Sequence, residues 1–187
     1  MRQIMLSDIM QKKLARHFTF RDLNKDGYVE RSDWEQCARN LAALRGWEPG
    51  SAEYQEVMAR HVAMWNTFWL PADQDQDGKV ILEEYLYLAE TQRRLGFTYE
   101  MRQVIYLFEA IFDTIDLDGD GEITRDEYKL FFEAWGIDTN LAEAAFSRMD
   151  FNEDGRLARS TFLQYGSNFY INDEPDVVGN YLFGPYQ

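Results

Sequence analysis

Residues 116–127 read DLDGDGEITRDE, a pattern from which the architecture of the whole chain can be predicted. Carboxylates occupy its first, third and fifth positions, Gly121 follows at the sixth, and the stretch closes on a glutamate. So many acidic side chains at short range repel one another and do not suit a buried helix or strand. A glycine at the sixth position permits the left-handed backbone of a sharp turn. The pattern predicts a loop whose oxygens point inward, toward a shared cation.

The same pattern occurs four times along the chain, which indicates an internal repeat. Loop 1 spans 22–33, loop 2 spans 73–84, loop 3 spans 116–127 and loop 4 spans 150–161. Two positions after its glycine, each loop has an apolar residue suited to a short bridging strand: Val29, Val80, Ile123 and Leu157. We therefore expect four helix-loop-helix units, joined two by two through short β-bridges.

The segments that flank the loops have the apolar spacing of amphipathic helices. Apolar residues recur at intervals of three and four from Trp34 to Leu44, and again from Tyr128 to Trp135. A glycine follows each run, as expected just beyond the end of a helix. The sequence predicts an all-α fold with eight main helices.

Two glycine-containing segments, 46–50 and 95–98, are the expected connections between helices. The second divides the chain into two halves of similar length. We expect residues 1–95 to form an N-terminal pair of units and residues 96–187 to form a C-terminal pair.

The composition excludes several classes of protein. Hydrophobic residues make up 45% of the 187 residues, so the chain can form a core despite its net charge of −14. That charge argues against a nucleic-acid or anionic-membrane surface. The sequence contains no apolar run long enough to span a bilayer and no secretory signal, and Cys37 is its single cysteine. We expect a cytoplasmic monomer without integral membrane association.

The spacing within the loops is typical of calcium sites. Calcium takes six to eight oxygens, and a twelve-residue loop supplies them from positions 1, 3, 5, 7, 9 and 12, with a backbone carbonyl at position 7. In loop 3 the predicted ligands are Asp116, Asp118, Asp120, Glu122 through its carbonyl, and Glu127. In loop 2 they are Asp73, Asp75, Asp77, Lys79 through its carbonyl, and Glu84. Ile81 at the ninth position of loop 2 cannot orient a bound water, but we still expect this loop to bind metal.

Loops 1 and 4 depart from this pattern at their twelfth positions. The predicted ligands of loop 1 are Asp22, Asn24, Asp26, Tyr28 through its carbonyl, Glu30 and Asp33. An aspartate at position 12 is one methylene shorter than glutamate, which weakens bidentate capture of calcium and makes magnesium more competitive. Loop 4 has Thr161 at this position and is expected to be a structural partner of loop 3. The sequence therefore predicts about three bound calcium ions, with magnesium an alternative in loop 1.

Taken together, the chain resembles the EF-hand calcium-binding proteins of the calexcitin, sarcoplasmic calcium-binding protein and calerythrin group. The features that carry the resemblance are the loop 1 that closes on Asp33, the aromatic segment MWNTFWLPAD before loop 2, the degraded loop 4 and the ending GNYLFG at 179–184. The resemblance implies two pairs of units around a shared core, with metal in loops 1, 2 and 3. It also implies a C-terminal tail, 180–186, that packs back onto the body.

Two functions fit these observations. The first is a calcium buffer or a calcium-responsive signalling protein with an unknown protein target. The alternative, suggested by the luciferin-binding members of the group, is a calcium-triggered carrier of a hydrophobic small molecule held among the aromatic residues. His17 and His61 lack the spacing of a catalytic or zinc site and are interpreted as ordinary helix residues, so we expect no enzymatic activity.

Overall fold

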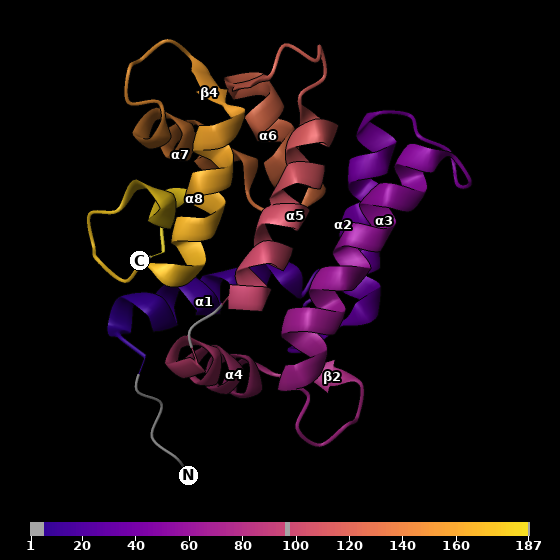
Figure 1. Cartoon of the computed structure of the whole chain (residues 1–187), viewed down its shortest axis with the longest axis vertical. Coiled ribbons are helices and arrows are strands. Elements are labelled where there is room, and N and C mark those ends of the chain that lie inside the picture. Colours follow the sequence, from indigo (N-terminus) through magenta and orange to yellow (C-terminus); the bar gives the residue numbers. More distant parts are fainter. Residues whose placement is uncertain (1–5, 96–97, 187) are drawn as a thin grey trace.

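A computed structural model of the chain describes residues 6–95 and 98–186 (Figure 1). Within these residues it contains eight α-helices, which confirms the predicted all-α class: α1 Asp8–Arg21, α2 Arg31–Leu44, α3 Ala52–Met64, α4 Leu82–Leu95, α5 Thr98–Ile115, α6 Arg125–Ala134, α7 Ala142–Met149 and α8 Arg159–Ile171. Helices α2 and α3 pack together, and α5 packs against both α3 and α8. Within the described ranges, none of the helices is long and apolar enough to cross a membrane.

The loops are joined in pairs by two small antiparallel bridges, as predicted. Strand β1 (Val29–Glu30) pairs with β2 (Lys79–Val80), and β3 (Glu122–Thr124) pairs with β4 (Arg156–Ala158). Val29 lies opposite Val80, and Ile123 lies opposite Leu157; all four side chains are buried. These apolar pairs hold the two loops of each pair side by side.

The helix boundaries follow from local capping. Thr124 precedes α6 and accepts a hydrogen bond from the Glu127 amide, while the Glu127 side chain accepts one from the Thr124 amide, which is a capping box. Beyond the end of α6, Gly136 has a φ of +66°, the left-handed conformation that glycine adopts at low cost. A Cβ at this position would lie 2.8 Å from the Leu23 side chain. Glycine at position 136 is therefore favoured mainly by its backbone conformation, since the Leu23 side chain can move away from an added Cβ.

The segment before loop 2 is not a single continuous α-helix. Helix α3 ends at Met64 and is followed by a π-helical turn, η1 (Trp65–Trp69), and a 3-10 turn, η2 (Leu70–Ala72). The wider turn buries Trp65, Phe68 and Trp69 together. Pro71, which lacks an N–H, then occupies the tighter turn that leads into loop 2.

One aromatic core is shared by helices from both halves of the chain. The ring centroids of Trp34, from the first half, and Trp135, from the second half, lie 6.4 Å apart. The Arg21 guanidinium lies between the two rings. Asn40 also donates a hydrogen bond of 3.0 Å to the Ala134 carbonyl across the same boundary. The expected connection at 95–98 includes residues 96–97, which lie outside the described residues, so the division into two halves stays a prediction.

The two histidines are buried parts of this core. The His17 ring nitrogens lie 2.9 Å from the Tyr85 hydroxyl and 3.1 Å from the Tyr170 hydroxyl. Burial lowers the pKa of His17 well below its usual value, and burial likewise lowers the pKa of His61 to about 3. Both imidazoles are therefore neutral at physiological pH, as suits uncharged core residues.

The C-terminal tail packs on the body through both apolar and polar contacts. Phe183 is fully buried, stacks on Trp135 and meets Phe169 edge to face. The carbonyl of Phe183 accepts hydrogen bonds of 2.7 and 2.9 Å from Arg16, and the Tyr128 hydroxyl donates one to the Leu182 carbonyl. The tail thereby closes one side of the core.

Truncation of this contact tests how much the tail contributes to stability. We expect Phe183→Ala to lower the free energy of unfolding of the metal-free protein by about 3–5 kcal/mol, because it leaves a cavity in the core. Denaturant unfolding followed by tryptophan fluorescence measures this loss. Phe151→Ala is the matched control: Phe151 is 92% exposed, so its truncation should change the stability by less than about 0.5 kcal/mol. Equal effects of the two substitutions would contradict a docked tail.

Candidate metal centre

The first aspartate of each loop organises the turn that follows it. In loop 3 the two carboxylate oxygens of Asp116 accept hydrogen bonds from the amides of Gly119 and Gly121, at 2.8 and 3.1 Å. The corresponding aspartates of the other three loops likewise accept the amide of the sixth-position glycine, at 2.9–3.0 Å: Asp22, Asp73 and Asp150. These backbone donors partly offset the charge of the aspartates and bend all four loops in the same way.

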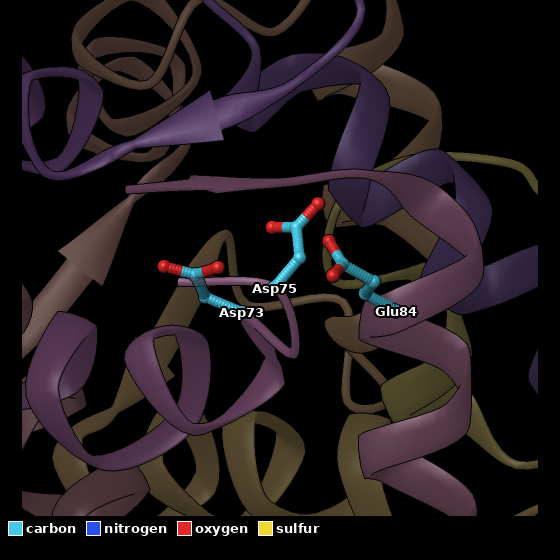
Figure 2. A group of neighbouring side chains, drawn as sticks. All are labelled: Asp73, Asp75 and Glu84. Atoms are coloured by element: carbon cyan, nitrogen blue, oxygen red, sulfur yellow. The ribbon is translucent and has the colours of Figure 1, made fainter. Parts of the chain in front are cut away.

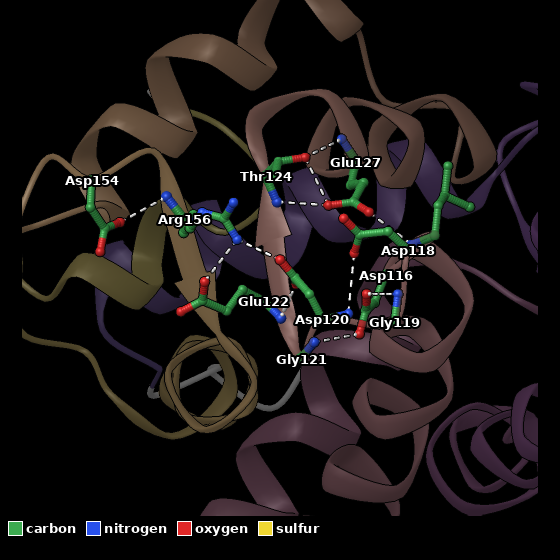
Figure 3. A network of polar contacts seen from close by, with 11 residues as sticks. Asp116, Asp118, Gly119, Asp120, Gly121, Glu122, Thr124, Glu127, Asp154 and Arg156 are labelled. Carbon is green, nitrogen blue, oxygen red and sulfur yellow. Dashed lines mark hydrogen bonds and ion pairs between the residues drawn. The ribbon is translucent and has the colours of Figure 1, made fainter.

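Loop 3 gathers its carboxylates at the connection between α5 and α6. Oxygens of Asp116, Asp118 and Asp120 lie within 4.8 Å of one another. Glu127 closes the loop from the first turn of α6: one oxygen accepts the Leu117 amide at 2.8 Å and the other accepts the Thr124 amide at 2.9 Å (Figure 3). The twelfth-position carboxylate is thus already tied to both ends of the loop.

Loop 2 has the same construction between η2 and α4. Oxygens of Asp73, Asp75 and Glu84 lie within 4.8 Å of one another, and Figure 2 shows the Asp75 and Glu84 carboxylates facing each other. Glu84 accepts the amides of Gln74 and Ile81, both at 3.0 Å. Asp77 lies outside this cluster and accepts the Lys79 amide at 2.8 Å. Lys79 occupies the seventh position, whose carbonyl is the predicted ligand.

Asp33 closes loop 1 with a shorter side chain and, like the glutamates of loops 2 and 3, accepts backbone amides from both ends of its loop, those of Leu23 and Glu30. One oxygen of Asp33 accepts the Glu30 amide at 2.8 Å, in a capping box at the start of α2. Burial raises the pKa of Asp33, and the nearby Asp22 and Asp26 carboxylates raise it further. The Asn24 amide group donates a hydrogen bond of 2.6 Å to Asp26. The ligands predicted for loop 1, which include the Tyr28 carbonyl, are therefore near one another, although they do not form a carboxylate cluster as close as those of loops 2 and 3.

Loop 4 keeps the turn but pairs its first acid with an arginine. The Asp150 side chain is 1% exposed, and one of its oxygens lies 3.5 Å from the Arg125 guanidinium, at the start of α6. Thr161 at the twelfth position offers no carboxylate. In loop 4 an internal cation, which also pairs with Glu143, therefore lies against the acid that begins the loop.

The sequence reasoning missed two arginines that reach between loops 3 and 4. Arg125 belongs to loop 3 and contacts Asp150 of loop 4, whereas Arg156 belongs to loop 4 and contacts Asp120 and Glu122 of loop 3. A signal existed in the predicted bridge, because pairing Ile123 with Leu157 places Arg156 opposite Thr124. The contacts of Arg156 hold the pKa of Asp120 below its usual value, together with a hydrogen bond from the Glu122 amide, which is the larger cause.

The described oxygens suit a hard divalent cation. Carboxylate and backbone oxygens make up the predicted ligands of loops 2 and 3, without the nitrogen or sulfur donors that zinc prefers. The Glu84 and Glu127 side chains each present two oxygens from the end of the loop. This donor set is the one that calcium takes in twelve-residue loops.

Comparisons with known proteins agree with this geometry. Residues 108–132 match the family model described as "EF hand". The sarcoplasmic calcium-binding protein of Perinereis vancaurica tetradentata is 28% identical over 96% of this chain and 99% of its own length. Calerythrin of Saccharopolyspora erythraea is 25% identical over 89% of this chain and 95% of its own.

Two solved structures share the fold. The sarcoplasmic calcium-binding protein of amphioxus has a TM-score of 0.71 at 20% identity and covers 96% of this chain and 98% of its own. Magnesium-loaded apo-berovin, a ctenophore photoprotein, has a TM-score of 0.66 at 19% identity, and the match covers 86% of this chain and 87% of berovin. The report on berovin states that all three of its calcium-binding loops bind magnesium. Fold, loop geometry and sequence relatives together identify the chain as an EF-hand protein related to the sarcoplasmic calcium-binding proteins and calerythrin.

Proposed function

We propose that this protein binds calcium ions through loops 1, 2 and 3. The observation that carries the proposal is the placement of Glu84 and Glu127, each of which bridges backbone amides at the two ends of its loop. A carboxylate so placed faces the aspartates that begin the loop and offers calcium two oxygens at once. The names of the sarcoplasmic relatives, which also describe calcium binding, support the proposal.

Loop 1 is proposed as the site with the least preference for calcium over magnesium. Asp33 is one methylene shorter than the glutamates of loops 2 and 3 and is buried at the start of α2. A single oxygen from position 12 fits the six-ligand geometry of magnesium better than the seven or eight ligands that calcium accepts. We propose that loop 4 binds neither ion, because Thr161 replaces the last carboxylate and Arg125 pairs with the first.

The proposed role is calcium buffering in the cytoplasm by a monomer. Buffer EF-hands open little when they bind calcium, whereas sensor EF-hands expose an apolar groove. Here the groups that link the halves are buried: Trp34, Trp135 and Phe183 each have no exposed surface. Opening this core would expose large aromatic surfaces, at a cost of roughly 25 cal/mol for each Å². A calcium-responsive signalling role would require a partner that covers such a surface.

Within the described residues, the pocket among the core aromatic side chains is too small to support the carrier alternative. A pocket among α1, α4 and α8, lined by residues that include Leu14, Phe68 and Tyr170, has a cavity volume of about 10 Å³. That space holds roughly one water molecule, whereas small-molecule sites have volumes of about 300–1,000 Å³. Trp69, which is fully buried, stacks on Tyr85 beside this pocket. We therefore do not adopt carriage as the proposed function.

Removal of the last carboxylate of loop 3 tests calcium binding directly. We expect Glu127→Gln to weaken calcium binding at loop 3 by about two orders of magnitude, since it replaces a charged, two-oxygen ligand. Calorimetric titration should then give one fewer tight calcium ion per chain. Glu133→Gln is the matched control, because Glu133 is exposed six residues further along α6. A wild-type protein that binds no calcium at millimolar concentration would refute the proposed function.

The ion preference of loop 1 can be tested by lengthening its last ligand. We expect Asp33→Glu to raise the ratio of calcium to magnesium affinity at loop 1 by about tenfold, because the longer side chain presents both oxygens. Calcium titrations with and without magnesium measure this ratio. Asp126→Glu makes the same chemical change at an exposed position of loop 3 that is not a predicted ligand, and it should leave the ratio unchanged. An unchanged ratio in the loop 1 variant would disprove the explanation from side-chain length.

Buffer and sensor roles differ in the apolar surface that calcium exposes. For a buffer we expect calcium to change the fluorescence of an added anilinonaphthalene dye by less than about twofold, since the aromatic core stays closed. The acid-unfolded protein provides the positive control for dye binding. A large rise in dye fluorescence on adding calcium to the native protein would favour the signalling role.

A further inference from the structure

Arg156 of loop 4 lies against the acidic side chains of loop 3. Its Nη1 atom is 2.5 Å from Asp120 Oδ2 and 3.0 Å from Glu122 Oε2 (Figure 3). The register of the bridge explains the contact: Arg156 lies opposite Thr124, and Glu122 is two residues away from Thr124 on the same face. The β3–β4 bridge thus brings a guanidinium from the degraded loop to its intact partner.

Asp120 is the predicted fifth-position ligand of loop 3, and both of its oxygens are engaged. Oδ1 accepts the Glu122 amide at 2.9 Å, and Oδ2 accepts Arg156. A cation that takes Asp120 as a ligand therefore competes with the guanidinium for that carboxylate. Arg156 also places a positive charge next to the site, which repels a divalent cation.

We propose that Arg156 sets the calcium affinity of loop 3, as an internal cation that calcium must displace from Asp120. This inference rests on the proposed function of loop 3 as a calcium site. Loop 4 then has a role that does not require it to bind metal: through Arg156 it weakens calcium binding in its partner. By thermodynamic linkage, calcium in loop 3 weakens the contact of Arg156 with Asp120 by the same factor. Occupation of loop 3 is thereby transmitted to a side chain of loop 4.

Arg159 provides a matched control for the effect of charge alone. It lies three residues after Arg156, has a similar exposure, and pairs with Asp113 of α5, which lies outside loop 3. Substitution of either arginine by glutamine removes one positive charge from the same end of loop 4. A specific role for Arg156 requires that the two substitutions have unequal effects on loop 3.

The experiment is a calcium titration followed by nuclear magnetic resonance. The Gly121 amide, which donates to Asp116, reports on loop 3, and the Gly155 amide, which donates to Asp150, reports on loop 4. We expect Arg156→Gln to tighten calcium binding at loop 3 by about two- to fivefold, the range for breaking an exposed ion pair. Arg159→Gln should tighten it by less than about 1.5-fold. The difference in calcium affinity between Arg156→Gln and the wild type should shrink at 1 M salt, because salt screens exposed charges.

Two further measurements make the result decisive. In the wild type, the Arg156 Nε resonance should shift as loop 3 fills with calcium. The Arg156→Lys variant keeps the positive charge, so its calcium affinity should lie between those of the wild type and Arg156→Gln. Equal affinities of the two glutamine variants, or weaker binding in Arg156→Gln with the metal-free spectrum intact, would overturn the inference while leaving calcium binding established. A wild-type Gly121 amide that does not respond to calcium would instead overturn the proposed function of loop 3.

Discussion

Carboxylates are crowded into four short loops, and their mutual repulsion must be offset for the chain to fold. The four loops contain 18 of the 33 acidic residues and 6 basic ones, so most of the net charge of −14 is concentrated there. Like charges at such distances repel strongly unless other groups neutralise them. In each loop the backbone offsets part of this repulsion, because the amide of the sixth-position glycine donates a hydrogen bond to the first aspartate. Complete neutralisation requires cations, either bound from solution or supplied by the protein.

The aromatic core holds these loops in place against their repulsion. The last residue of loop 1, Asp33, is followed directly by the buried Trp34, and the last residue of loop 3, Glu127, is followed by the buried Tyr128. Each twelfth-position carboxylate is thus adjacent in the chain to a large core side chain, and a shift of the carboxylate is opposed by close packing. A core shared by both halves therefore suits the proposed buffering role, in which the loops bind ions with little opening.

Features that depend on local spacing could be predicted from the sequence, whereas features that depend on packing could not. The loops, the eight helices and the pairing of Ile123 with Leu157 follow from residue types at fixed intervals. The π-helical turn at 65–69 does not, because it depends on how three aromatic side chains fit the core. The position of Arg21 between Trp34 and Trp135 likewise joins residues that are distant in the sequence. The individual metal ligands stay predictions, since their chemistry rests on loop position.

Loop 4 indicates what happens to such a loop when it loses its last ligand. Asp150 is nearly inaccessible to solvent and still accepts the amides of Asp154 and Gly155, so the bend survives without Glu at position 12. A buried carboxylate without a counter-charge is costly, and Arg125 supplies that charge from loop 3. Arg156 makes the opposite contact from loop 4 to loop 3. The two paired loops therefore share their charges across the β-bridge, and the electrostatics of loop 3 cannot be understood without loop 4.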